Sequence, residues 1–324
     1  MSQSEADSAV EALLASLGRI DTGKPSRVVP LPGHFASVLR IDEHRGIAFG
    51  ADGVGTKMVL AERLEHFETI GIDCIAMNVN DLVCVGAEPI ALVDTILCRD
   101  ADPAVIGAIG EGLRRGAELS GIEIPGGEIA QVGDVVGGWE LSGSSIGLVD
   151  LDAIVTGDRI RAGDALIGMP SSGLHSNGYT LARKALDEIP LEDERLGRPL
   201  GEVLLEPTTI YVLAVLELLA SPLDVRGLAH ITGDGLNNLL RLSREVGYEI
   251  SAPLPVPPIF GLIAECGAVE EAEMYEVFNM GLGFVVVLPD ADADAAVELL
   301  SAHHPGSRVI GRVSDRAGMI DRPG

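Results

Sequence analysis

A glycine-rich segment near the N-terminus combines residue types that bind phosphate. Residues 50–57 read GADGVGTK, so Asp52, Gly53 and Gly55 precede Thr56 and Lys57. Glycines let the backbone turn its N–H groups toward an anion, and a lysine adds a point charge. A Walker loop has its lysine before the Ser/Thr, so this segment is a different motif. An acid beside phosphates requires a cation between them, and Asp52 therefore predicts a magnesium–ATP complex.

A second acid is a candidate for the same site. Asp81 follows Asn80 within a stretch, residues 70–85, whose pattern predicts a helix. Magnesium bound to phosphates usually takes one or two protein carboxylates, and Asp52 and Asp81 can supply them. The residues alone leave an alternative open, in which both are ordinary surface or helix-end acids of an acid-rich chain.

Composition limits the class of protein. The chain has 324 residues and 47% hydrophobic content, enough for two folded domains, and no apolar run of membrane-spanning length. A net charge of −26 argues against nucleic-acid binding. Four cysteines without C-x-x-C spacing and an N-terminus without a signal-peptide pattern favour free thiols in a reducing cytoplasm. Lysine is rare, as only Lys24, Lys57 and Lys184 occur, which favours a specific role for Lys57.

Alternating strand and helix patterns must position these residues. An amphipathic helix is predicted over residues 2–18, and a helix over residues 103–120 begins with an Asp102 cap and ends near Gly121. We expect further strands at 47–49, 90–97, 139–149, 165–169 and 284–288, and helices at 208–219, 237–246 and 291–300. This alternation is typical of α/β or α+β layers. A polar, turn-rich segment near Gly157 divides the chain into domains 1–157 and 158–324.

A third segment supplies candidate substrate contacts. Residues 171–178 read SSGLHSNG, between a predicted strand and a helix starting near Thr180. Seryl hydroxyls, backbone N–H groups and a helix N-terminus together make an anion site, although an ordinary strand-to-helix turn with a capping serine fits the same residues. The flanking glycine and asparagine predict that His175 is exposed to a cleft. From local sequence alone, a structural hydrogen-bonding histidine is the alternative.

Several motifs, in the expected order, resemble the phosphoribosylformylglycinamidine cyclo-ligase family, the aminoimidazole ribonucleotide synthetases of purine biosynthesis. They are DGVGTK (52–57), VNDLVCVGAEP (79–89), SSGLHSNGY (171–179), LEPT (205–208), AHITG (229–233) and MYEVFN (274–279). The sequence departs from the family pattern at its N-terminal entry, at IAQV (129–132) and at Asp234, where the family usually has glycine.

The resemblance implies a fold, a reaction and a set of site residues. It implies two α/β domains, a homodimer that pairs its N-terminal sheets, and a nucleotide site in the cleft between domains. ATP would phosphorylate the amide oxygen of formylglycinamidine ribonucleotide, and a neighbouring nitrogen would then close the imidazole ring. Catalytic roles fall on His175, Lys57 and Asp81, and magnesium on Asp52, Asp81 and Glu128, where Glu128 belongs to a GGE run after a short strand. ATP contacts are implied for Asp52, Gly53, Gly55, Thr56, Lys57, Asn80 and Asp81. Substrate contacts are implied for Ser171, Ser172, Gly173, His175, Ser176, Asn177, Thr232 and Gly233.

Two other functions remain open. One is a kinase or synthetase of the same superfamily with another small substrate, against which the SSGLHSNGY motif argues. The other is a non-catalytic nucleotide-binding dimer, against which the joint presence of Asp52, Lys57, Asp81 and His175 argues. A redox dinucleotide enzyme is disfavoured because no G-x-G-x-x-G opens a βαβ unit.

Overall fold

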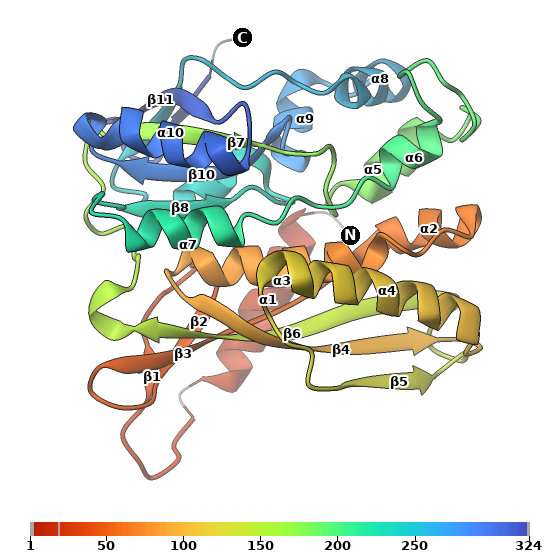
Figure 1. Cartoon of the computed structure of the whole chain (residues 1–324), viewed down its shortest axis with the longest axis horizontal. Helices are drawn as coiled ribbons and strands as arrows, with labels where there is room; N and C mark the ends of the chain where they lie inside the picture. The colour runs from red at the N-terminus through yellow and green to blue at the C-terminus, as the bar shows by residue number, and fades with distance from the viewer. Residues whose placement is uncertain (1–2, 19, 323–324) are drawn as a thin grey trace.

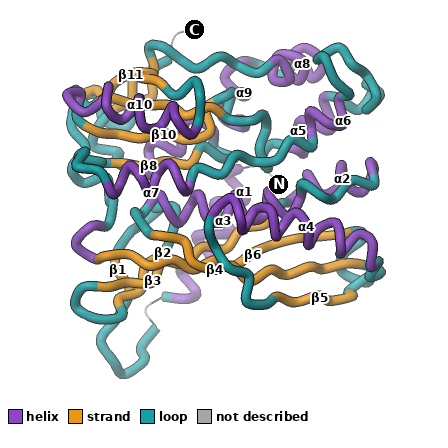
Figure 2. The backbone as a smooth tube through the Cα atoms, viewed as in Figure 1, coloured by secondary structure: helices purple, strands orange, loops and turns teal. Residues whose placement is uncertain are grey.

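Two six-stranded sheets lie one above the other, each with helices packed against it (Figure 1). The computed structural model describes residues 3–18 and 20–322, and side chains from residue 8 onward. Strands and helices alternate through both halves (Figure 2), which confirms the predicted α/β class. Helix α3 (Ile70–Cys84) lies between the halves, in contact with the N-terminal sheet on one side and with β8 (Gly227–His230) and α7 (Val212–Ala220) on the other. Among the described residues, no helix is long and apolar enough to cross a membrane.

The N-terminal sheet has the strand order β1-β2-β3-β6-β4-β5. Neighbouring strands run antiparallel except for β4 and β5, which are parallel. One face packs on α3, and the other presents apolar side chains that are 38–45% exposed: Leu39, Phe49, Val93 and Leu148. The strands are β1 (Val28–Val29), β2 (Ser37–Arg40), β3 (Arg45–Gly53), β4 (Glu88–Cys98), β5 (Gly127–Gln131) and β6 (Trp139–Asp150).

Helix α4 (Pro103–Ser120) begins and ends where the sequence predicts. The Asp102 carboxylate caps its N-terminus, and Gly121 ends it in the left-handed region with φ of 73°. Helix α3 packs closely on α4, because a Cβ added to Gly71 would lie 2.1 Å from the backbone nitrogen of Leu113. Only a glycine permits this approach, which fixes α3 over the sheet. The short helix α2 (Met58–Leu64) precedes them.

The C-terminal sheet has the order β12-β9-β11-β7-β10-β8 and is covered more completely. Every residue of β10 is buried, as expected for a strand with elements on both faces. The strands are β7 (Ala165–Pro170), β8 (Gly227–His230), β9 (Gly247–Ile250), β10 (Leu282–Leu288), β11 (Arg308–Ser314) and β12 (Ile320–Asp321). The helices are α5 (Tyr179–Ala185), α6 (Leu200–Leu204), α7 (Val212–Ala220), α8 (Pro258–Gly267), α9 (Glu271–Val277) and α10 (Ala293–His303).

Two helix predictions in this half were wrong in extent. The helix predicted over residues 208–219 begins only at Val212. The segment before it bonds to distant parts of the chain: the N–H groups of Thr208, Thr209 and Tyr211 donate to Asp73, His175 and Asn80, and the Thr209 carbonyl oxygen accepts from the Asn80 amide. The helix predicted over residues 237–246 is the short 3-10 helix η3 (Gly235–Arg241). In the N-terminal half, the GGE run lies at the start of β5 instead of following a strand.

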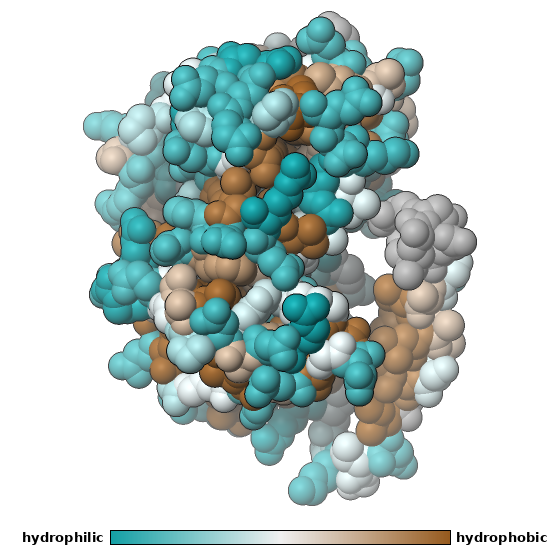
Figure 3. Space-filling model, turned by 90° about the vertical axis from the view of Figure 1, so that its right-hand side faces the viewer, coloured by the Kyte–Doolittle hydropathy of each residue, from teal (hydrophilic) through white to brown (hydrophobic). Residues whose placement is uncertain are grey.

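Helix α1 (Gln3–Leu17) confirms the predicted amphipathic helix. Its apolar residues do not pack on the chain, since Val10, Leu13, Leu14 and Leu17 are 52–62% exposed. Figure 3 shows a column of hydrophobic side chains that stands apart from the main body, beside the N-terminal half. An amphipathic helix normally buries its apolar face, so this face lacks a cover within the described chain.

Candidate active site

One face of α3 carries polar side chains toward the C-terminal half. Asp81 is the one residue of this 15-residue helix that is not buried. Asp73, Met77, Asn80 and Asp81 recur at the three- and four-residue spacing that places side chains on one helix face. Their partners lie in residues 176–177, residues 208–211 and His230, all in the C-terminal half. This polar face therefore joins the two halves of the chain.

Asp81 and Asp52, which we call the carboxylate pair, lie at the solvent-exposed end of this face. We call this end the open end. Asp81 is 20% exposed, and its Oδ1 lies 2.9 Å from Nδ1 of the buried His230. The pKa of Asp52 is raised, chiefly by burial and also by the charge of Asp81, against a hydrogen bond donated by the Gly53 N–H. Carboxylates that repel each other in a partly buried place suit a divalent cation. His230 lies in the AHITG motif, but no sequence pattern predicted its contact with Asp81.

Arg241 supplies positive charge beside the carboxylate pair. Its Nε donates to the carbonyl oxygen of Gly33 at 2.9 Å, and its guanidinium lies over the Phe35 ring, 4.4 Å from the centroid. The pKa of His34 falls to about 4, first through burial and then through the charge of Arg241. Arg241 also lines a hollow of about 740 Å³. An exposed guanidinium here is suited to phosphate oxygens, yet no motif in the sequence singles it out.

Glu128 does not join the carboxylate pair. The strand register runs from Glu128 through Thr95 and Ser142 to Gly53, across three strand spacings. At about 4.8 Å per spacing, the Glu128 backbone lies roughly 14 Å from that of Gly53. Glu128 is exposed at the edge of the sheet, whereas Asp52 faces α3. Within the described chain, no three His, Cys, Asp or Glu side chains form a group that could hold a metal ion.

The other predicted nucleotide contacts divide between a loop and the interior. Gly53 ends β3, and Gly55 has a φ of 65°, which favours glycine at this turn. Thr56 is exposed, with its Oγ1 3.3 Å from that of Thr180 in α5. Asn80 is fully buried. Its Nδ2 donates to the carbonyl oxygen of Thr209, and its Oδ1 accepts from the N–H of Tyr211, each at 2.9 Å. Asn80 thus lies in the contact between the halves.

Lys57 is turned away from the glycine-rich segment and is fully buried, which differs from the predicted position beside ATP phosphates. Its Nζ forms an ion pair with Oδ2 of Asp73 at 2.7 Å and donates to the carbonyl oxygens of Glu206 at 2.7 Å and His175 at 3.2 Å. Burial lowers the pKa of Lys57, and the charge of Asp73 opposes this. The three partners of the Lys57 ammonium therefore lie where the two halves of the chain meet.

His175 is also buried, not exposed to a cleft as its neighbours in the sequence suggested. Its backbone is left-handed, with φ of 62°. Its Nε2 accepts hydrogen bonds from the N–H groups of Ser172 at 3.2 Å and Thr209 at 3.4 Å. The proton of the neutral ring must then lie on Nδ1, which has no hydrogen-bond partner among the described residues. Burial holds the pKa of His175 well below its usual range, so the ring stays neutral near pH 7.

The serines of the predicted substrate segment are engaged within the protein. Ser171 Oγ donates to the carbonyl oxygen two residues on at 3.1 Å, and Ser172 Oγ donates to that of Pro207 at 2.6 Å. Ser176 Oγ donates to the Asp73 carboxylate at 3.1 Å. These bonds fix the path of residues 171–176 against the neighbouring segment and α3.

The remaining predicted substrate residues lie on two neighbouring loops. A Cβ on Gly233 would lie 3.3 Å from Oδ1 of Asn177, so these two residues come together. Thr232 is held by its N–H, which donates to Asn238 Oδ1 at 2.7 Å. Gly173 has a φ of 152°, which favours glycine. Asn177 and Gly233 can therefore contact one bound group from two sides.

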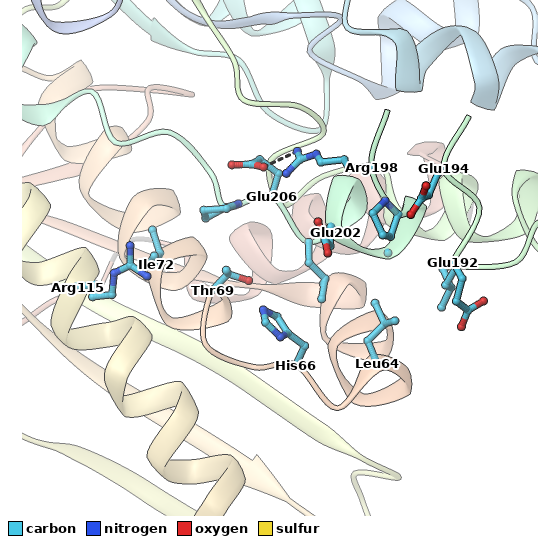
Figure 4. A pocket seen from close by; sticks show the side chains of 15 residues that line it. Leu64, His66, Thr69, Ile72, Arg115, Glu192, Glu194, Arg198, Glu202 and Glu206 are labelled. Atoms are coloured by element: carbon cyan, nitrogen blue, oxygen red, sulfur yellow. Dashed lines mark hydrogen bonds and ion pairs between the residues drawn. The ribbon is translucent and has the colours of Figure 1, made fainter. Parts of the chain in front are cut away.

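A separate cavity of about 670 Å³ lies between α2, α4 and α6 (Figure 4). None of the predicted site residues lines it. Its charged lining comprises Arg115, Arg198, His66, Glu192, Glu194, Glu202 and Glu206. Arg198 forms an ion pair with Glu206, so acids outnumber the free cations, and this cavity is poorly suited to the phosphates of ATP.

Comparison with solved structures defines the class of fold. An AaThiL protein complexed with AMPPCP and TMP matches with a TM-score of 0.69 and 17% identity over 99% of this chain and 95% of that one. The HypE–HypF complex matches with a TM-score of 0.69 and 17% identity over 97% and 95%. The chain thus has the two-domain α/β fold of these proteins.

Comparison of sequences defines the family. The AIR synthase related protein N-terminal and C-terminal domains match residues 33–149 and 161–321. Two relatives, from Pyrococcus furiosus and Methanothermobacter thermautotrophicus, are named phosphoribosylformylglycinamidine cyclo-ligase. The first is 50% identical over 89% of this chain and 85% of its own length, and the second is 46% identical over 93% and 89%. The chain belongs to the phosphoribosylformylglycinamidine cyclo-ligase family, which confirms the resemblance of its motifs.

Proposed function

We propose that the protein closes the imidazole ring of formylglycinamidine ribonucleotide in purine biosynthesis, with conversion of ATP to ADP and phosphate. The observation that carries this is the 50% identity, over 89% of the chain, to a relative named for this activity. The amide oxygen of the substrate is a poor leaving group until ATP phosphorylates it. A neighbouring nitrogen then attacks the carbon, and phosphate departs. Because closure is intramolecular, correct positioning can supply much of the rate.

For the nucleotide, we infer that the carboxylate pair holds the magnesium ion of magnesium–ATP. The donors fit, since Asp52 and Asp81 offer hard oxygen ligands in a partly buried place where their charges repel each other. Bound magnesium would neutralise phosphate charge. His230 orients Asp81 from the buried side, and Arg241 is exposed beside the pair to meet a phosphate oxygen. Glu128 lies too far along the sheet to complete this set within one chain.

We propose that the substrate binds to the two loops that contain residues 171–178 and 232–233. Asn177 and Gly233 come together across these loops, so a bound ribonucleotide would contact both. Several side chains of the first loop are used to fix its path, as the bonds of Ser172 and Ser176 show. We therefore infer that backbone N–H groups and the Asn177 amide, more than the serine hydroxyls, bind the substrate.

An ADP-release assay tests this function. Purified protein with magnesium–ATP is given formylglycinamidine ribonucleotide, and ADP and the aminoimidazole product are measured in the same samples. We expect equal amounts of both products. We expect no ADP above background with thiamine monophosphate, which is chosen because one solved structure of similar fold is a thiamine monophosphate kinase. ADP formed with thiamine monophosphate but not with the ribonucleotide would overturn the proposal.

We further propose that the protein is a homodimer that pairs its N-terminal sheets. The outer face of the sheet exposes Phe49, Val93 and Leu148, and the register places them on the same face. Helix α1 adds a second uncovered apolar surface. Light scattering during gel filtration should give twice the mass of the 33.8 kDa chain. Phe49→Asp should give the monomer mass, while Val135→Asp, at an exposed valine outside the strands, should leave the dimer.

A further inference from the structure

We propose that Lys57 is a positioning residue. Paired with Asp73, it clamps residues 175–176 and 206–208 of the C-terminal half against α3, and so sets the geometry of the substrate loop instead of binding an ATP phosphate. The clamp itself follows from contacts within the chain. Its effect on substrate rests on the proposed function above.

The ammonium of Lys57 already has three partners within the protein. A lysine ammonium carries three N–H donors and no acceptor. In this structure the three partners are the Asp73 carboxylate and the carbonyl oxygens of Glu206 and His175, at 2.7, 2.7 and 3.2 Å. A phosphate oxygen would have to displace one of these partners from a side chain with no exposed surface.

Asp73 completes the clamp on the other side of the ion pair. While Oδ2 faces Lys57, Oδ1 accepts hydrogen bonds from the Thr208 N–H at 2.8 Å, the Thr208 hydroxyl at 2.7 Å and the Ser176 hydroxyl at 3.1 Å. Two side chains of the N-terminal half thus hold two separate segments of the C-terminal half. Removal of either charge alone would leave its partner buried and uncompensated, whereas removal of both would not.

The clamp acts directly on His175. Lys57 donates a hydrogen bond to the carbonyl oxygen of His175. The His175 ring accepts hydrogen bonds from the N–H groups of Ser172 and Thr209. A left-handed backbone at a residue other than glycine persists only where its surroundings hold it. Loss of the Lys57 contact should therefore let residues 171–176 relax, and with them the neighbouring Asn177.

A set of four variants separates this role from phosphate binding. Lys57→Met, Asp73→Asn and the double variant are compared with Lys184→Met, a matched change at an exposed lysine. We measure the Kd for magnesium–ATP by calorimetry, and kcat/KM for the ribonucleotide at saturating ATP. In Lys57→Met we expect kcat/KM to fall by about 10²-fold, the cost of a small misplacement, with the Kd for magnesium–ATP near the wild-type value.

The double variant keeps the test decisive if Lys57→Met does not fold. We expect it to fold and to regain part of the kcat/KM lost in Lys57→Met, because no buried charge is left unpaired. A phosphate ligand would behave differently. Every variant without Lys57, the double included, would then lose magnesium–ATP affinity, and this result would overturn the proposal.

Amine labelling tests the clamp independently of activity, since the chain has only three lysines. Acetic anhydride followed by mass spectrometry should modify the exposed Lys24 and Lys184 rapidly and spare Lys57, with or without magnesium–ATP. Asp73→Asn should make Lys57 more reactive. Rapid labelling of Lys57 in wild-type protein, blocked by magnesium–ATP, would refute the clamp. If the ring-closing assay failed but this protection were observed, the proposed function would fall and the clamp would stand.

Discussion

The two ends of the polar face of α3 place an aspartate in opposite circumstances. Asp73, in the first turn, is completely buried, paired with Lys57 and bonded to Thr208 and Ser176. Asp81, near the last turn, is 20% exposed and contacts His230. An aspartate whose oxygens are all engaged holds structure together, whereas one with free lone pairs at the surface can bind a cation.

The same contrast separates the two basic groups that could meet ATP. Lys57 belongs to the glycine-rich motif but has its charge neutralised inside the protein. Arg241 belongs to no motif, yet it is exposed and acts electrostatically on Asp52. Solvent access, more than residue type, therefore decides which basic group can bind the nucleotide. We call the buried end of the polar face, at Asp73, the closed end. The variants below test whether the open end binds magnesium–ATP and whether the closed end positions the substrate loop.

Asp81→Asn should produce the largest effect on turnover, and it changes the open end alone. It keeps the shape of the side chain but removes the charge that we assign to magnesium, so turnover should fall by about 10²-fold or more. The urea midpoint should change little, because Asp81 is partly exposed. Calorimetry with magnesium–ATP gives the affinity, and Asp94→Asn, at a half-buried acid on β4, is the control. Wild-type magnesium–ATP affinity in Asp81→Asn would remove Asp81 from the metal site.

The sequence predicted the class of fold, the capped helix α4 and the amphipathic helix α1, because these depend on local periodicity and capping. It did not predict that residues 208–211 remain outside α7, where Thr208, Thr209 and Tyr211 bond to Asp73, His175 and Asn80 from distant parts of the chain. For the same reason, the burial of Lys57 and His175 was not predicted. Local motifs identify residue types, whereas burial depends on contacts between the two halves.

His230→Ala should have the next largest effect and tests whether the open end needs its buried support. His230 donates from Nδ1 to Asp81, and mutation of a residue that hydrogen-bonds a metal ligand typically lowers metal affinity by about 10–100-fold. Magnesium should therefore support turnover only at higher concentrations. His230→Asn, which can place an N–H donor near the position of Nδ1, should recover part of the loss. An unchanged magnesium titration in His230→Ala would show that Asp81 needs no such support.

His175→Ala and His175→Gln test the closed end. The alanine variant removes the acceptor of the Ser172 and Thr209 N–H groups in a partly buried place, which should lower the free energy of unfolding by about 1–3 kcal/mol in total. Gln can return an acceptor near the position of Nε2 and should restore stability and most turnover. A proton relay at His175 would make Gln as inactive as Ala, because an amide does not titrate. Urea unfolding and turnover measured on both variants distinguish the two roles.

His34 has the smallest effect at pH 7 and gives a pH signature at the open end. Its pKa in the folded protein is about 4, lowered by burial and by Arg241 against the opposing charges of Asp81 and Asp158, compared with 6.5 for an ordinary histidine. Above pH 6.5 neither the folded nor the unfolded state protonates it. As the pH falls from 6.5 toward 4, only the unfolded state gains a proton, so the free energy of unfolding decreases, by about 2–3 kcal/mol in total.

Other groups titrate in the same range, so the measurement is a difference between wild type and His34→Asn, which retains an acceptor for the Phe35 N–H. Urea unfolding at pH 7, 6, 5 and 4 should show the wild type losing more stability than the variant, with the gap widening between pH 6.5 and 4. Magnesium–ATP at saturation should preserve this difference if it binds the folded state equally in both proteins. Parallel pH curves would mean that His34 is accessible to protons in the folded state, and that this end of the site is more open than the structure indicates.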